Sequence, residues 1–118
     1  MESTHHTIAD VELAADDLAV STAFYAAAFG WSVDDYGPTY AGIRASSGDG
    51  EVGGLNTSNS GGPGGALVLL TSDDVDASLA AVETTGGRVV TPVEAYSGGR
   101  RFTFADPAGT VLGVFQSD

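Results

Sequence analysis

Apolar and polar residues alternate along several short segments of the chain, and glycine-rich turns separate these segments. A period of two residues is typical of β-strands with one buried face. It predicts strands at 7–13 and 65–71, each followed by a helical segment. Three further strands are predicted after each helix, at 31–35, 39–46 and 51–57 and at 88–94, 100–105 and 110–116. The sequence therefore predicts an α+β fold in which a β-α-β-β-β unit occurs twice.

Two turns close the last hairpins of these units, Gly48-Asp49-Gly50 and Asp106-Pro107-Ala108-Gly109. Both are turn sequences, because glycine accepts the positive φ angles that tight hairpins need. The strand after the second turn carries Gly113 at its centre, where a strand loses packing and backbone entropy. We interpret Gly113 as a position where a ligand approaches the sheet closely.

The two helical segments are copies of each other. "DDLAVSTAFYAAAFGWSV" (16–33) aligns without gaps with "DDVDASLAAVETTGGRVV" (73–90). Acidic residues at the start of each copy are suited to cap a helix, and a glycine, Gly30 or Gly87, is expected to end each helix with a left-handed cap. The apolar stripes of the two helices are Leu18, Tyr25 and Phe29, and Val75, Leu79 and Val82. We interpret both helices as structural.

The length of 118 residues suits one domain, with module one at about 7–57, a Gly/Ser-rich linker at 58–65 and module two at about 66–118. The linker lacks the lysine of a phosphate-binding loop. No apolar run approaches the ~18 residues that span a membrane, and "MESTHHTIAD" lacks the basic and apolar regions of a signal peptide. The chain has no cysteine, which excludes disulfides and cysteine-based zinc sites. A cytoplasmic protein is expected.

Charge narrows the classes of partner. Sixteen acids stand against four arginines and no lysine, so the net charge is −12. Nucleic-acid backbones and anionic membranes both need a basic face, so neither is an expected partner.

Three segments carry a family resemblance: "DDLAVSTAFYAAAFGW", "DDVDASLAAVETTGGRVVTP" and "GGRRFTFADPAGTVLGVFQ". They resemble the vicinal oxygen chelate superfamily, which holds glyoxalase I, bleomycin-resistance proteins, fosfomycin-resistance enzymes and extradiol dioxygenases. The small glyoxalase-like subgroup is the most similar. The resemblance implies two βαβββ modules whose mixed sheet curls into a cup for a small molecule, and a homodimer.

Metal-binding members of this superfamily place ligands on the first and last strands of the modules. By this resemblance the ligand positions fall on Asp10, Leu67, Gly113 and either Gly54 or Asn56. Leucine and glycine have no ligating side chain, and a divalent cation needs oxygen or nitrogen donors. We therefore expect no metal and no cofactor.

The carboxylates of the first strand are the candidates for chemistry. Strand alternation places Asp10 and Glu12 on one face, which the resemblance assigns to the cup, and Leu13 on the face under the helix. Arg44, Arg100 and Arg101 are the expected partner cations. The expected ligand-binding residues are Asp10, Glu12, Tyr40, Arg44, Leu67, Tyr96, Phe102, Gly113 and Phe115. His5 and His6 are expected to belong to a loose terminus, with their side chains pointing apart.

Besides a regulatory or scaffold subunit whose cup is empty, two functions remain open at this point. The first is a metal-free small-molecule-binding protein that sequesters an antibiotic or a metabolite. The alternative is an enzyme, a glyoxalase-like lyase or isomerase or a relative of the dioxygenases, that uses Asp10 and Glu12 as acid and base or uses a metal.

The excess of acids predicts a salt-dependent stability. Repulsion among the carboxylates opposes the compact state at low ionic strength, and added salt screens this repulsion. The melting temperature, measured by circular dichroism, should rise between about 10 mM and about 300 mM NaCl. A flat or falling curve would show that like-charge repulsion does not limit the fold.

Overall fold

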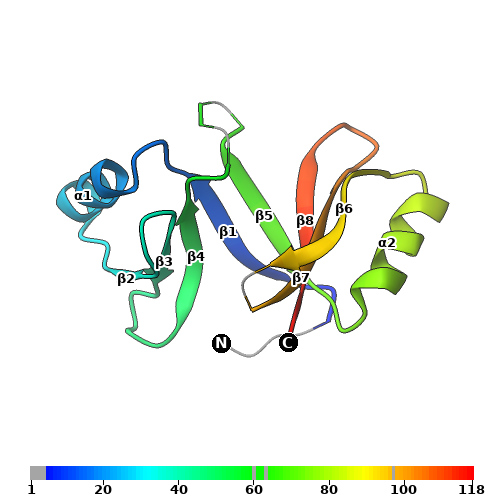
Figure 1. Ribbon diagram of the computed structural model, residues 1–118, viewed down its shortest axis with the longest axis horizontal. Helices are drawn as coiled ribbons and strands as arrows, with labels where there is room; N and C mark the ends of the chain where they lie inside the picture. Colours follow the sequence, from blue (N-terminus) through cyan, green and yellow to red (C-terminus); the bar gives the residue numbers. More distant parts are fainter. Residues whose placement is uncertain (1–4, 60, 63, 97) are drawn as a thin grey trace. The chain divides into compact units, whose positions relative to one another are not determined.

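The fold is α+β, with eight strands and two helices among the residues that the structure describes (Figure 1). This computed structural model describes residues 5–59, 61–62, 64–96 and 98–118. The elements are, in order, β1 (Ile8–Ala14), α1 (Leu18–Phe29), β2 (Val33–Asp35), β3 (Tyr40–Arg44), β4 (Glu51–Asn56), β5 (Ala66–Thr71), α2 (Val75–Thr84), β6 (Arg88–Tyr96), β7 (Gly99–Ala105) and β8 (Val111–Ser117). The β-α-β-β-β order occurs twice, as predicted.

The described chain divides into two compact units: residues 10–67 form unit 1, and residues 5–9 with 68–118 form unit 2. In unit 1 the strand order is β2-β3-β4-β1, with β3 antiparallel to β2 and β4, and β1 parallel to β4. In unit 2 the order is β5-β8-β7-β6, with β8 parallel to β5 and antiparallel to β7. The two units therefore share one topology, as the sequence repeat implies.

Helix α1 begins and ends as the sequence predicts. The Asp17 carboxylate accepts a hydrogen bond from Val20 N at 3.2 Å, which satisfies one of the free N–H groups of the first turn. Gly30 ends the helix with a φ of 72°. Neither helix of the described residues has the length and apolarity to cross a membrane.

Helix α2 departs from the prediction at its end. Asp74 caps its start, accepting from Ala77 N at 3.0 Å. The helix ends at Thr84 with Thr85 as its cap, and the left-handed residue is Gly86, with a φ of 103°. Gly87 is not in that conformation, so the expected glycine cap was placed one residue too late. Gly86 and Gly87 are equally suited by sequence to a left-handed cap, and the local hydrogen bonds determine which of them adopts it.

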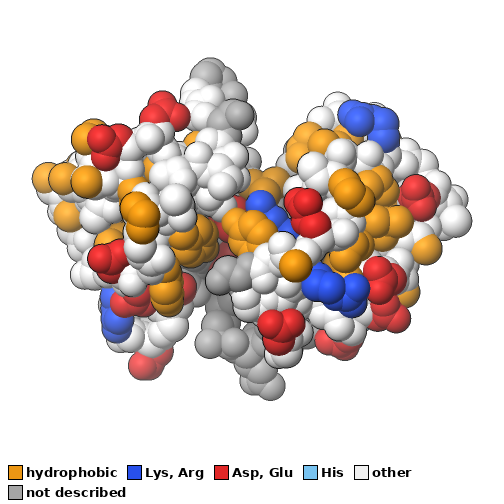
Figure 2. All heavy atoms as spheres, viewed as in Figure 1, with side chains coloured by type: hydrophobic (Ala, Val, Ile, Leu, Met, Phe, Trp, Pro, Cys, Tyr) orange, Lys and Arg blue, Asp and Glu red, His pale blue; other side chains and the backbone are white. Residues whose placement is uncertain are grey.

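Each unit has its own hydrophobic core beneath its helix. In unit 1, Ala15, Ile43 and Leu55 are buried, and Leu13, Leu18, Tyr25 and Val33 pack against them. In unit 2, Val75, Phe102 and Val114 are buried. The partly buried residues that pack against them are Leu70, Leu79, Val82, Val93 and Phe104. α2 buries Val75 and Ser78, whereas α1 buries no residue. Figure 2 shows hydrophobic side chains on the surface of unit 1. The large hydrophobic side chains of α1 that are exposed are Val20, Phe24 and Phe29.

The N-terminal histidines are anchored, contrary to the expectation of a loose terminus. His6 Nε2 lies 3.0 Å from Ser78 Oγ, and the His6 backbone N–H donates to Thr71 O at 2.8 Å. Asp73 N donates to His5 Nδ1 at 2.9 Å. The two rings stack with centroids 3.6 Å apart instead of pointing apart. Residues 5–7 therefore belong to unit 2, because they pair with the end of β5 and contact α2.

The core of unit 2 generates a stability prediction. Phe102 is 0% exposed, whereas Phe24 is 57% exposed. Phe102→Ala should lower the free energy of unfolding by about 3–5 kcal/mol, since it leaves a cavity in a packed core. Phe24→Ala is the matched control and should change it by less than about 1 kcal/mol. Urea denaturation followed by circular dichroism measures both, and equal losses would show that Phe102 does not organise this core.

Candidate functional site

The sheet of unit 1 has one face under α1 and one face away from it. Alternation places Leu13, Leu55 and Ile43 under α1. The opposite face, here called the polar face, carries a row of register partners: Glu12 beside Gly54, Gly54 beside Gly42, and Gly42 beside Asp34. Asp10 and Tyr40 lie on the same face by the period of two.

Two glycines form the floor of the polar face. A Cβ added at Gly54 would collide with the Tyr40 hydroxyl, and one added at Gly42 would collide with the Glu51 carboxyl group. The side chains of Tyr40 and Glu51 therefore lie flat against the sheet, directly over the glycine backbone. Any side chain at positions 42 or 54 would displace them.

Glu12 is held in the most enclosed part of this face. It is 2% exposed, and its Oε1 accepts hydrogen bonds from Asn56 Nδ2 at 3.3 Å and from Asn59 Nδ2 at 3.4 Å. Asn56 is itself fixed, because its Oδ1 accepts from Ser58 N at 2.9 Å. These amide donors hold the Glu12 carboxylate in one orientation.

Arg44 and Arg100 pair with acids other than the expected ones. Arg44 donates to Asp34 Oδ1 at 2.9 Å and to the Gly48 carbonyl at 2.9 Å. Arg100 donates to Asp76 Oδ2 at 3.2 Å. Among the described residues, the ion pairs of these two arginines are therefore with Asp34 and Asp76, and not with the expected Asp10 and Glu12.

The acids of the polar face differ in their titration. Burial, followed by the repulsion of Glu12, raises the pKa of Asp10 above its usual range. Burial also raises the pKa of Glu51, although Tyr36 donates to its Oε2 at 2.6 Å. The hydrogen bond from Arg44 lowers the pKa of Asp34. The face thus combines carboxyl groups with raised and lowered proton affinity.

The sheet face of unit 2 that lies away from α2 carries aromatic rings. The Arg101 guanidinium carbon lies 3.9 Å from the centre of the Tyr96 ring, a cation–π contact. A Cβ at Gly99 would meet the Phe115 ring, so this ring also lies over a glycine. Gly113 is buried between Leu69 and Thr103 in the register of this face.

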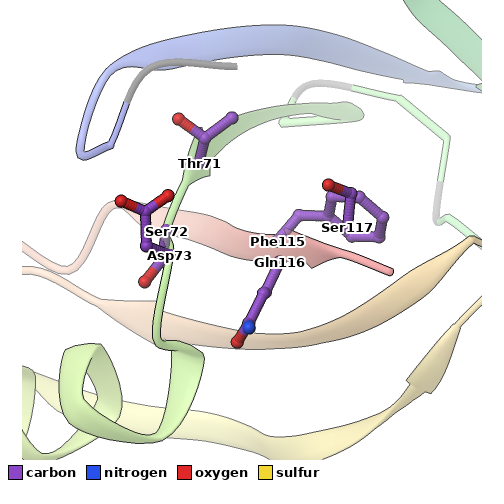
Figure 3. Close-up of a pocket in the computed structure, with 6 residues that line it drawn as sticks. All are labelled: Thr71, Ser72, Asp73, Phe115, Gln116 and Ser117. Atoms are coloured by element: carbon purple, nitrogen blue, oxygen red, sulfur yellow. The ribbon is translucent and has the colours of Figure 1, made fainter.

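A small polar pocket of unit 2 lies where β5 leads into α2 (Figure 3). It measures about 140 Å³ and is lined by Thr71, Ser72, Asp73, Phe115, Gln116 and Ser117. Gln116 Oε1 accepts from Val75 N at 2.8 Å, and Ser72 Oγ lies 2.7 Å from Ser78 Oγ. The pocket is smaller than typical ligand sites, and its polar groups cap α2. We assign it a structural role.

The structure brings together most of the predicted site residues within each unit. Asp10, Glu12, Tyr40 and Arg44 share the polar face of unit 1, and Leu67 is partly buried in β5. Tyr96, Gly113 and Phe115 belong to unit 2 on the face away from α2. Phe102 differs from the expectation, because it lies in the core under α2. Gly113 pairs with Thr103, so residue 102 points to the other side of the sheet.

Sequence reasoning missed Glu51 and Asn59. A bulge between Ile43 and Arg44 sets Glu51 opposite Arg44, and this irregularity breaks the period of two. Asn59 follows β4 and reaches back to Glu12. The only available signal for either was the polar residue type.

The metal that the resemblance implies does not fit the residues at its ligand positions. Leu67, Gly54 and Gly113 offer no donor atom, and the Tyr40 hydroxyl fills the space above Gly54. Within the described residues no three His, Asp or Glu side chains cluster in a way that could hold a metal ion. The donor set of this chain differs from a divalent-cation site.

Comparison with known proteins gives a family model and two curated relatives. The model described as Glyoxalase/Bleomycin resistance protein/Dioxygenase superfamily matches residues 5–114. The anthracycline biosynthesis protein DnrV of Streptomyces peucetius is 33% identical over 125 residues, covering 89% of this chain and 45% of that protein. The anthracycline biosynthesis protein DauV of Streptomyces sp. (strain C5) is 31% identical with the same coverage. The chain therefore spans less than half the length of these relatives.

Solved structures share the fold. The Mn(II)-bound glyoxalase from Novosphingobium aromaticivorans has a TM-score of 0.66 and 26% identity, covering 98% of this chain and 40% of that chain. Methylmalonyl-CoA epimerase from Mycobacterium tuberculosis has a TM-score of 0.69 and 17% identity, covering 100% of this chain and 93% of that chain. The second likeness concerns the fold alone.

The raised pKa of Asp10 generates a pH prediction. The folded protein binds this proton more tightly than the unfolded chain does, so stability falls as the pH rises from the pKa of the unfolded chain through the raised pKa of the folded protein. Asp10→Asn should therefore be more stable than the natural protein at pH 7, and the difference should shrink on acidification. Glu51 and Asp34 titrate in both proteins, so their effects largely cancel.

Urea denaturation of both proteins between pH 7 and pH 4 measures this difference. Asp49→Asn, at an exposed turn, is the control and should show no comparable gain. A variant that is less stable at pH 7, or a gain that stays constant down to pH 4, would contradict the assignment.

Proposed function

Because the chain belongs to the Glyoxalase/Bleomycin resistance protein/Dioxygenase superfamily, we propose that it binds a small aromatic molecule of the anthracycline type without needing a divalent cation. The observation that carries the proposal is the glycine-floored polar face, where Glu12 and the Tyr40 hydroxyl flank Gly54. Because Gly42 and Gly54 have no Cβ, the Tyr40 and Glu51 side chains lie against the sheet, so a flat molecule can lie over them within reach of their polar groups.

The polar groups of this face suit a ring system that carries hydroxyl and carbonyl groups. A carboxylate accepts hydrogen bonds, whereas a phenol both donates and accepts them. Glu12 can thus accept from a ligand hydroxyl, and Tyr40 can donate to a ligand carbonyl. Two amides orient Glu12, which reduces the entropy that binding would otherwise cost.

The aromatic residues of unit 2 support the same class of ligand. The Tyr96 ring with Arg101 on it and the Phe115 ring over Gly99 are flat surfaces that can stack on a ring system. A net charge of −12 further favours ligands that are neutral or cationic.

The two anthracycline biosynthesis proteins support the ligand class but not an activity. They are about twice as long as the aligned region, so what each whole protein does is not transferred to this chain. Sequestration of the bound molecule, a homodimer and a cytoplasmic location remain part of this proposal.

An acid–base enzyme is the second candidate, favoured by the pair Asp10 and Glu12. A half-buried carboxyl group with raised pKa beside a second carboxylate is a common acid–base arrangement. In that case Glu12 would remove a proton next to a ligand carbonyl, and Asp10 would return one. This candidate requires turnover, whereas the binding protein requires none.

The proposal predicts how binding responds to two substitutions. An anthracycline aglycone, titrated by its own fluorescence in buffer with EDTA, should bind the natural protein. Glu12→Gln should weaken binding by about tenfold, since a hydrogen bond to a charged group is worth about 1.5–3 kcal/mol. Gly54→Ala should weaken it at least as much because it displaces Tyr40. Asp49→Asn is the matched control and should bind normally.

Three outcomes decide between the candidates. Binding lost on adding EDTA would overturn metal independence, and equal affinity in all variants would overturn the polar face as the site. A changed product, detected by mass spectrometry and abolished by Glu12→Gln, would favour the enzyme. Circular dichroism confirms that each variant is folded.

A further inference from the structure

We infer that unit 1 has a second ligand site on its other side, a groove between α1 and the β2–β3 region that accepts a small cationic amphiphile. The groove measures about 640 Å³, within the range of about 300–1,000 Å³ for small-molecule sites. It lies on the α1 side of the sheet, since Val33 and Ala41 line it, so it is separate from the polar face. The inference does not depend on the proposed function.

The groove exists because α1 presents small side chains to the sheet edge. Ala19, Ala23 and Ala26 line it, at a spacing that places them on one face of the helix. Leu18 and Tyr25 hold α1 on the core beside this stripe. The small side chains leave unfilled the space that longer ones would occupy, which fits the absence of any buried residue in α1.

The opposite wall comes from β2, β3 and their connection. Val33, Pro38 and Ala41 supply apolar surface, and Gly37 leaves the mouth open, with a φ of 108° that glycine accepts readily. The walls are therefore mostly apolar on both sides. An aliphatic chain or a small ring can bury itself there at roughly 25 cal/mol per Å² of apolar surface.

The negative charge of the groove lining favours a cationic ligand. Of the described residues that line the groove, Asp17 and Asp35 are charged and none is basic. Each carboxylate accepts one backbone hydrogen bond, Asp17 from Val20 N and Asp35 from Gly37 N. Arg44 does not neutralise them, because it is paired with Asp34 on the polar face. An ammonium group with an apolar tail complements this lining.

Calorimetric titration with n-octylamine, n-octanol and octanoate tests the site, with ¹⁵N-labelled protein to locate binding by NMR. Octylamine should bind at least about tenfold more tightly than octanol, and octanoate should not bind. The amide shifts should be concentrated in residues 17–26 and 33–41. Ala23→Phe fills the groove and should weaken octylamine binding at least about tenfold. Ala28→Phe, on an exposed position outside the groove, should leave it unchanged.

A second variant separates charge from shape. Asp35→Asn keeps an acceptor for Gly37 N but removes the charge. The affinity for octylamine should therefore fall several-fold, while the affinity for octanol should not change. Asp49→Asn is its control. Equal binding of amine and alcohol, normal binding in Ala23→Phe, shifts outside these ranges, or no binding up to millimolar octylamine would each overturn the inference.

Discussion

The close approach of side chains to the backbone at Gly42 and Gly54 is the constraint on which the candidate site depends. Their register places both glycines in one row with Glu12 and Asp34. Because neither has a Cβ, the Tyr40 ring and the Glu51 carboxyl group lie across the strands rather than standing away from them. Two strands of ordinary β-branched residues would pack better. The glycines thus reduce side-chain packing on this face, and they allow polar groups to lie close to the backbone of the sheet.

A carboxylate in that position has a cost that the surrounding residues offset. An enclosed, ionised carboxylate is unfavourable unless hydrogen bonds replace its water. Asn56 and Asn59 supply two such bonds to Glu12, and the turn after β4 fixes Asn56 through Ser58. Asp10 is half-buried, and this burial, followed by the repulsion of Glu12, raises its pKa. Two carboxyl groups on one strand therefore have different chemistry because their neighbours differ.

The sequence predicted the elements well because they depend on local rules. Alternation located the strands, Asp17 and Asp74 marked the helix starts, and the turn at Asp106 closes the last hairpin as expected. The residues that the sequence placed wrongly depend on tertiary contacts instead of local rules. Phe102 went to the core because its face is decided by which side α2 covers, and Glu51 reached the polar face through a bulge. The anchoring of His5 and His6 depends on Ser78 and Asp73, about seventy positions away in the chain.

The family match establishes the fold of this chain, whereas its chemistry depends on the side chains at the site. The fold follows from pattern and register, and the family model confirms the resemblance read from the helix and hairpin motifs. Chemistry follows from the donor atoms, and those have changed here. The resemblance places a ligand of the first module at Gly54 or Asn56, and at Gly54 this chain has no side chain and the Tyr40 hydroxyl above it. A phenol and a carboxylate form hydrogen bonds directly with hydroxyl and carbonyl groups, as the proposed ligand requires. The conserved architecture of the sheet can thus serve ligand binding with a different set of contacts, because the backbone positions are shared while the side chains at the site are not.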